Sequence, residues 1–313
     1  MSKWLKTCPY RGSLIGIVVF FVALSILSPV FLSMNNFVNI FNQITVNAII
    51  AAGITLLIIS GGIDLSVGSI LALCGIFTAN YFRNAPAGGS VLIGILIGVV
   101  IGVSCGLFNG LLIAYLHIPP FIATLGTMSI FRGMALVFSG GRPLMDLNER
   151  YINLFTGFIG PLPKQFVLAI LISLLLYLVL ERTSVGRVAF ALGGNERCVM
   201  ISGINIKTYK LLFYGLSGLL AALGGMVLTS MIPAAEPIAG MNYEMDAIAV
   251  VVMGGTSMEG GKGNILGTLL GAILLGIVRN GLNLLGVDAN YQQLFIGLII
   301  MIAIVSGSSK KDA

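Results

Sequence analysis

The chain has 313 residues, of which 57% are apolar and only 9% are charged. A soluble globular domain carries about 25% charged residues, so this composition excludes that class and indicates an integral membrane protein. The formal net charge is +6, but the basic residues are scattered or stand beside apolar runs. Because they form no basic face with interleaved aromatic residues, nucleic acid is not an expected partner.

Apolar runs of membrane-spanning length recur along the whole chain. A spanning helix needs about 20 mostly apolar residues, and a single chain must return across the bilayer after each crossing. We therefore predict an all-α polytopic integral membrane protein, a single transmembrane domain over 1–313 with about ten transmembrane helices. The predicted runs are 13–32, 44–60, 66–82, 90–116, 119–138, 164–181, 208–231, 243–256, 264–286 and 290–306.

The distribution of basic residues predicts the orientation of these runs. An even number of crossings places both termini on one side. If that side is the cytosol, 11 Lys and Arg residues fall in inner segments and four in outer segments. Because cytoplasmic loops hold the excess of Lys and Arg, both termini are predicted to be cytoplasmic. The short run 243–256 carries Glu244 and Asp246 near its outer end, which leaves an eight-span or re-entrant arrangement open.

The longest polar interval is 181–210, which carries five of the 17 Lys and Arg residues and is predicted to be a cytoplasmic loop. Within it the sequence predicts a tight turn at Gly193 and Gly194, Asn195 as a helix N-cap, and a short helix from Glu196 that ends near Gly203. The expected apolar stripe of this helix is Val199, Met200 and Ile204. A short capped helix offers a rigid knob to another protein, and a plain interhelical linker is the simpler alternative.

Glycine is placed with some regularity. It recurs every four residues from Gly94 to Gly110 and again from Gly263 to Gly271. Small residues at this spacing let helices approach closely, and we favour a helix pair within one subunit over a contact between subunits. Two Gly-rich turns, at 61–70 and 254–265, resemble each other. The second lacks the spacing of a phosphate-binding loop, so we interpret it as a tight turn and expect no nucleotide hydrolysis by this chain.

Asp64 is the one charge near the inner ends of the second and third predicted helices. An acid within the membrane is a candidate proton or cation site. An Asp at a helix start also accepts backbone N–H bonds, and Gly61, Gly62 and Asp64 together have the pattern of a helix break followed by a cap. We favour the cap.

Two arginines, Arg132 and Arg279, fall inside predicted helices, where each needs water, an acid or backbone carbonyls as a partner. The candidate acids are Asp64, Glu244 and Asp246. With three asparagines the arginines form a candidate hydrophilic pathway, and hydrogen bonding between helices is the alternative. The pathway set is Asn109, Arg132, Arg279, Asn280 and Asn283. With one histidine, His117, and no nucleophile motif, the sequence predicts no catalytic site, no metal site and no bound cofactor.

Four separated stretches resemble the sugar permease subunits of bacterial ABC importers of the ribose type. They are GGIDLSVGS at 61–69, HIPPFIATLGT at 117–127, GRVAFALGGNERCVMISGINI at 186–206 and YEMDAIAVVVMGGTSMEGGKGNILGT at 243–268. The resemblance implies a lipid-embedded subunit of the bacterial cytoplasmic (inner) membrane that pairs with a second, identical or different, permease subunit. It also implies ATP-binding subunits docked on the cytoplasmic loops and an extracytoplasmic sugar-binding protein.

By the same resemblance, segment 193–203 matches the segment that couples the permease to its ATPase, with Glu196 and Gly203 at matching positions. The expected function is therefore translocation of a monosaccharide, ribose or a similar pentose or hexose, by a non-enzymatic subunit whose partner binds ATP. Two alternatives stay open. One is an ion-coupled secondary transporter that uses Asp64, and the other is an ABC permease for branched-chain amino acids or nucleosides.

Overall fold

The computed structural model describes residues 10–85, 89–288, 291–292, 294–295, 297–298 and 301. These residues form helices and one short hairpin, which confirms the predicted all-α class. The helices are α2 (Arg11–Leu27), α3 (Met34–Ile59), α4 (Val67–Asn84), α5 (Val91–Ala114), α6 (Pro120–Ser139), α7 (Glu149–Phe155), α8 (Lys164–Arg182), α9 (Ser184–Gly194), α10 (Glu196–Ile201), α11 (Ile206–Met231), α12 (Tyr243–Met253) and α13 (Ile265–Leu284). The hairpin joins β1 (Phe158–Ile159) to β2 (Leu162–Pro163).

Six of the described helices are long and apolar enough to cross a membrane: α3, α5, α6, α8, α11 and α13. The predicted count of about ten is therefore not confirmed. Helix α2 has 17 residues and α12 only 11, so both are shorter than the predicted runs. The last predicted run, 290–306, lies mostly outside the described residues, as do the two termini whose location was predicted.

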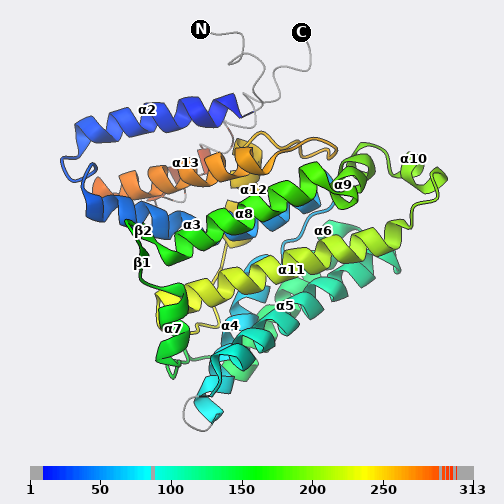
Figure 1. The fold of residues 1–313 in the computed structure, drawn as a ribbon, viewed down its shortest axis with the longest axis horizontal. Coiled ribbons are helices and arrows are strands. Elements are labelled where there is room, and N and C mark those ends of the chain that lie inside the picture. The colour runs from blue at the N-terminus through cyan, green and yellow to red at the C-terminus, as the bar shows by residue number, and fades with distance from the viewer. Residues whose placement is uncertain are drawn as a thin grey trace.

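Helix α3 forms the centre of the bundle. Every residue from Ile44 to Ile59 is buried, and α3 packs against α8, α11, α12 and α13 (Figure 1). Its N-terminus is capped by Ser33, whose side chain accepts the backbone N–H of Asn36 at 3.3 Å. A helix that is apolar on all sides is stable only when other apolar elements surround it, and the neighbouring helices provide that environment.

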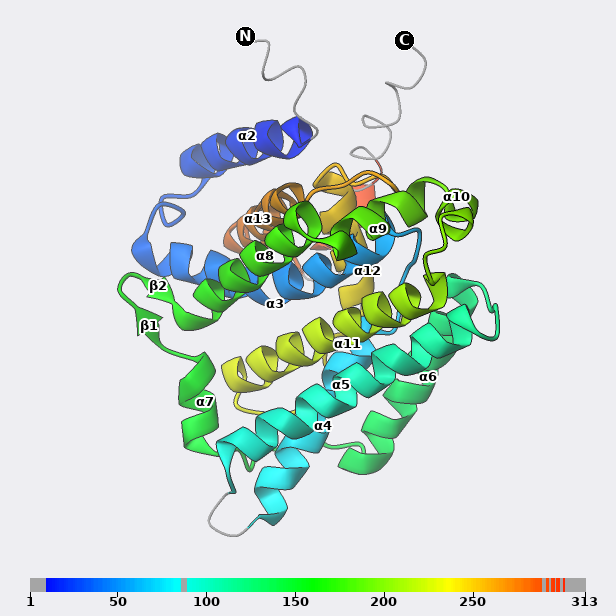
Figure 2. The same cartoon turned by 45° about the vertical axis from the view of Figure 1, so that its right-hand side comes forward.

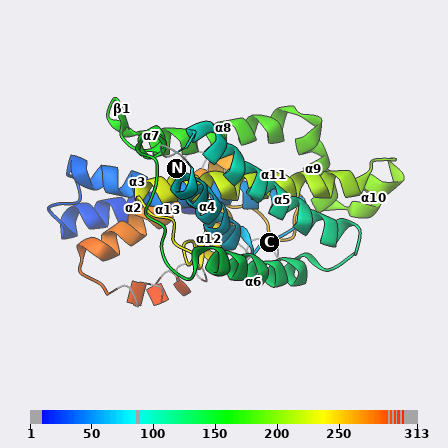
Figure 3. The ribbon, with the colours of Figure 1, turned by 90° about the horizontal axis from the view of Figure 1, so that it is seen from below.

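The bundle has two distinct ends. Helix α10 lies at one extreme of the long axis, and the end of α2 with the start of α3 lies at the other, with the β1–β2 hairpin and α7 nearby (Figures 1 and 3). The start of α2 lies beside the end of α12, where the Ser13 hydroxyl donates to the carbonyl of Met253, the last residue of α12. The turns that follow α3 and α12 meet at the α10 end, where Gly261 N–H donates to the Ile59 carbonyl at 2.8 Å.

The glycine repeat of α5 faces other helices of the same chain. A Cβ built on Gly102 would lie 2.5 Å from both the Ala222 Cβ and the Gly218 carbonyl oxygen on α11, and one on Gly106 would strike the Tyr214 carbonyl. The repeat therefore brings the backbones of α5 and α11 into contact, which confirms packing within one subunit. Dispersion packing of this kind is the main attraction between helices in lipid.

Gly106→Val is expected to destabilise the chain. The valine Cβ would meet backbone atoms of α11 that cannot rotate away, and overpacking of this kind costs about 1–3 kcal/mol. Gly126→Val on α6 is the matched control, because no atom lies within 4 Å of the position its Cβ would take. Thermal unfolding in detergent should show a lower midpoint for Gly106→Val alone. Equal shifts for the two variants would contradict the assigned packing.

Candidate functional site

The predicted short helix exists as α10, and its ends are as expected. The Asn195 side chain accepts the backbone N–H of Cys198 at 3.1 Å, so Asn195 is the N-cap. Gly203 follows the helix with a φ of +78°, a conformation that favours glycine. The tight turn predicted at Gly193 and Gly194 is wrong, because these residues are the last two of α9. The Asn195 N–H still donates to the Ala191 carbonyl at 2.9 Å, so helical bonding continues through both glycines.

Helix α10 projects from the end of the bundle (Figure 2). Met200 and Ile201 expose 60% and 80% of their surface, whereas Val199 is buried against the body. The expected stripe of Val199, Met200 and Ile204 is therefore not one face. Lys210 Nζ of α11 lies 2.7 Å from Glu196 Oε1 and links α10 to the start of a long helix. Helix α10 is therefore a small knob that is fixed to α11 by this ion pair and exposes two apolar side chains, Met200 and Ile201.

The base of this knob contacts two other segments backbone to backbone. A Cβ on Gly193 would strike the Ile59 carbonyl oxygen and the Gly261 nitrogen, and one on Gly260 would lie 2.9 Å from the Gly193 Cα. We call Ile59, Gly193, Gly260 and Gly261 the glycine junction. It joins the end of α9 to the end of α3 and to the turn between α12 and α13. The second Gly-rich turn is thus confirmed as an interhelical turn.

Asp64 lies fully buried in the break between α3 and α4, two residues after Gly62. Its carboxylate accepts the Ser66 N–H at 2.9 Å, the Ser66 hydroxyl at 2.6 Å, the Ser217 hydroxyl at 3.2 Å and the Asn109 amide at 3.4 Å. Ser66, and not Asp64, occupies the N-cap position of α4. Asp64 therefore stabilises the residue before the helix, and it also ties this break to α5 and α11.

Arg132 satisfies its guanidinium with backbone carbonyls. Its Nη1 donates to the carbonyls of Pro237 and Ala239, both at 2.7 Å. These carbonyls belong to the irregular segment 232–242, which the Leu144–Ala235 bridge also holds. Irregular backbone is tolerated in a membrane protein where protein groups satisfy it. Because segment 232–242 is irregular, α12 begins only at Tyr243 and has 11 residues.

Arg279 pairs with Asp246, one of the predicted acids. Arg279 Nη2 lies 2.6 Å from each carboxylate oxygen of Asp246. The pair lines a cavity of about 710 Å³ between α3, α11, α12 and α13. We call it the α3 cavity. Its polar lining residues are Asn42, Gln43, Asn47, Asn242, Tyr243, Asp246, Arg279, Asn283 and Gln292.

The five candidate pathway residues do not form one site. Arg279 and Asn283 line the α3 cavity. Asn109 donates to Asp64 and Ser66, and Arg132 binds carbonyls. Asn280 exchanges two hydrogen bonds with Asn36, of 2.8 and 3.0 Å, between α13 and α3. The described contacts of Asn280 are therefore interhelical hydrogen bonds, whereas those of Asn109 join α5 to the break before α4.

Sequence reasoning missed the polar lining supplied by α3. Asn42, Gln43 and Asn47 stand in an interval without any charge, and Asn47 comes one helical turn after Gln43. Asn42 and Gln43 fall between the predicted runs 13–32 and 44–60, so they were not considered as functional residues. Their position in the interior of a long helix, with Gln43 four residues before Asn47, is the pattern that would have identified a polar patch.

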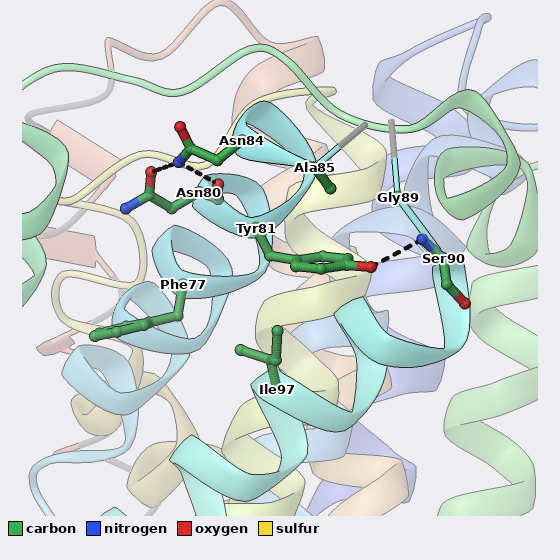
Figure 4. Close-up of a pocket in the computed structure, with 8 residues that line it drawn as sticks. All are labelled: Phe77, Asn80, Tyr81, Asn84, Ala85, Gly89, Ser90 and Ile97. Carbon is green, nitrogen blue, oxygen red and sulfur yellow. Dashed lines mark hydrogen bonds between the residues drawn. The ribbon is translucent and has the colours of Figure 1, made fainter. Parts of the chain in front are cut away.

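A second cavity, of about 760 Å³, lies between the end of α4 and the start of α5 (Figure 4). Its polar groups already bond one another. The Ser90 N–H donates to the Tyr81 hydroxyl at 2.9 Å, and the Asn84 amide donates to the Asn80 side chain at 3.0 Å. This cavity therefore has less unused hydrogen-bonding capacity than the α3 cavity.

Comparison with known proteins gives the family. A family model described as "Branched-chain amino acid transport system / permease component" matches residues 36–304. The chain belongs to this permease family. It is 44% identical to the ribose import permease protein of Bacillus subtilis (strain 168) over 96% of this chain and 92% of that one.

Other relatives in the permease family carry similar names. The ribose import permease protein of Escherichia coli (strain K12) is 41% identical over 99% of this chain and 96% of its own length. The D-allose transport system permease protein of the same strain is 38% identical over 88% and 83%. No solved structure matches the chain. These matches confirm the resemblance to sugar permeases, and the chain is a permease subunit of a transport system and not an enzyme.

Proposed function

We propose that this chain is the membrane-spanning subunit of an ATP-driven ABC importer that translocates a monosaccharide, ribose or a similar pentose or hexose. An extracytoplasmic binding protein delivers the sugar, and separate ATPase subunits bind ATP. Two permease subunits, identical or different, form the pathway in the bacterial cytoplasmic (inner) membrane. Residues 1–313 form a single domain that crosses the membrane about ten times, with both termini in the cytosol. Its coupling loop is 181–210.

The observation that carries this proposal is the position of α10. The knob projects from the end of the bundle (Figure 2), and segment 181–210, to which it belongs, carries five of the 17 Lys and Arg residues. The distribution of charge assigns this segment to the cytosol. Residues Gly193, Gly194, Asn195, Glu196 and Gly203 form the coupling segment. Closure of an ATPase pair would move α10 as a rigid body, and the glycine junction would carry that motion to α3, α12 and α13.

The two alternatives have less support. An ion-coupled transporter needs an acid that is open to an ion, whereas four hydrogen-bond donors already surround the Asp64 carboxylate. A permease for branched-chain amino acids agrees with the family description, but the relatives reported above are named for ribose and D-allose. Both observations favour the sugar importer.

Glu196→Arg is expected to abolish coupling to the ATPase. The substitution reverses the charge at the first residue of α10 and breaks the pair with Lys210. An exposed ion pair contributes only about 0–1 kcal/mol to stability, so the chain should still fold. The measurement is vanadate-sensitive ATP hydrolysis and ribose uptake in liposomes that contain permease, ATPase and binding protein.

Glu181→Arg is the matched control, because it makes the same charge change at an exposed position in the last turn of α8, outside α10. Glu181→Arg should keep both activities, whereas Glu196→Arg should lose them. Ribose uptake that needs no ATPase and follows an ion gradient would overturn the proposed function.

A further inference from the structure

The α3 cavity contains hydrogen-bonding groups that the protein itself does not use. The Oδ1 of Asn47 and the Oε1 of Gln43 are buried and have no hydrogen-bond partner among the described residues. Asn47 is only 5% exposed, and both residues line the cavity. Buried amide oxygens without a partner are unfavourable by themselves. They are satisfied when a ligand or water in the cavity donates to them.

The charge of the cavity restricts the ligand. Among the described residues that line the α3 cavity, the charged side chains are Asp246 and Arg279. They neutralise each other in an ion pair in which Arg279 Nη2 donates to both carboxylate oxygens. An anionic or cationic ligand would therefore find no unpaired counter-charge. Amides and a tyrosine hydroxyl both donate and accept hydrogen bonds. This combination suits a neutral ligand that carries several hydroxyl groups.

The position of the cavity fits entry from the end of the bundle opposite α10. Its walls are the middle of α3, the last turn of α11, the start of α12 and the last turns of α13. Asn47 lies 13 residues after Met34 in a helix of 26 residues, which places it about 20 Å along the helix axis. The cavity thus lies beside the middle of α3, next to the ends of α11 and α13 that are far from α10. Its volume of about 710 Å³ falls within the range of small-molecule sites.

We propose that the α3 cavity is a weak monosaccharide site within each permease subunit, in which Asn47, Gln43 and the Arg279–Asp246 pair bind the sugar hydroxyls. This inference rests on the proposed function and names residues for it. The hydroxyls donate to the two unpartnered amide oxygens and accept from the remaining N–H groups of Arg279. Weak binding suits a transport step, because the sugar must also leave.

Site-directed labelling tests the proposal in the assembled importer. Met241 lines the cavity and is 59% exposed, and Met145 is 72% exposed in another loop at the same end and does not line it. Met241→Cys and Met145→Cys complexes are treated from outside with a membrane-impermeant maleimide, and modification at each position is measured by peptide mass spectrometry. Millimolar D-ribose should slow labelling at position 241 and leave position 145 unchanged.

A second substitution makes the test specific to the polar groups. Asn47→Leu in the Met241→Cys background keeps the size of the side chain and removes its hydrogen bonds. The D-ribose concentration that gives half protection should rise about tenfold, as expected for one or two lost hydrogen bonds, and ribose uptake should fall. Ile50→Leu, on the same helix but not in the lining, is the matched control.

The outcomes separate this inference from the proposed function. Uptake of ribose by wild type, with equal labelling at 241 in the presence and absence of ribose, would overturn the cavity site and leave the importer intact. Protection at 241 by L-leucine but not by ribose would overturn the sugar chemistry of the site. If wild type shows no ATP-dependent uptake of ribose or of any similar pentose or hexose, the proposed function is overturned, and the cavity proposal with it.

Discussion

Gly193→Ala is expected to reduce ATP-driven ribose uptake by at least about tenfold, the result of a penalty of roughly 1.4 kcal/mol or more in the coupled step. The added methyl group would strike the carbonyl oxygen of Ile59 and the backbone nitrogen of Gly261. These are backbone atoms, and they already bond each other at 2.8 Å. To accept the methyl group, α9 must move away from α3 and from the α12–α13 turn, which breaks the proposed route of motion.

Gly126→Ala on α6 is the matched control for this prediction. It also adds one methyl group to a helical glycine, but outside the coupling segment, and a Cβ there would meet no atom within 4 Å. Uptake and ATP hydrolysis should stay close to wild type. Size-exclusion chromatography of the complex with its ATPase distinguishes the two explanations for a loss of uptake. A folded but uncoupled Gly193→Ala complex elutes like wild type, whereas a misfolded one does not. Wild-type uptake by Gly193→Ala would show that the contact is not needed for coupling.

The sequence predicted best those features that depend only on residues nearby in the chain. The N-cap at Asn195 and the positive φ of Gly203 follow from local rules, and both are observed. The Gly193–Gly194 turn was wrong because a glycine pair permits a turn without requiring one. Here Gly193 is needed for its close approach to Ile59 and Gly261, a tertiary contact that no local pattern contains.

The candidate pathway shows the same limit. Polar residues inside apolar helices must find partners, so the sequence identified Arg132, Arg279, Asn109 and Asn280 as residues of interest. It does not give helix rotation or depth, which decide the partner. Arg132 therefore binds carbonyls of an irregular segment, and Asn280 binds Asn36, more than 240 residues away. Only the packed helices show which polar groups remain unused in a cavity.

Asp64→Ala is expected to destabilise the protein strongly. The substitution removes the acceptor for the Ser66 N–H and for the hydroxyls of Ser66 and Ser217 inside a fully buried site. Each buried donor left without a partner costs roughly 1–3 kcal/mol. Thermal unfolding in detergent should show a large fall in the midpoint. Asp146→Ala is the control, because the Asp146 side chain is 68% exposed and its contact with Arg83 is 3.7 Å long.

Asp64→Asn distinguishes a structural acid from a transporting one. The asparagine keeps the shape of the side chain, and its oxygen still accepts from Ser66. Its amide then faces the Ser217 hydroxyl, which can accept as well as donate. ATP-driven ribose uptake should therefore stay within about threefold of wild type, less than 1 kcal/mol. An ion-coupled carrier would lose uptake with this variant, because an amide cannot bind and release a proton or hold the charge of a cation. Loss of uptake in a stably folded Asp64→Asn protein would therefore favour ion coupling over the hydrogen-bonding role that the buried contacts support.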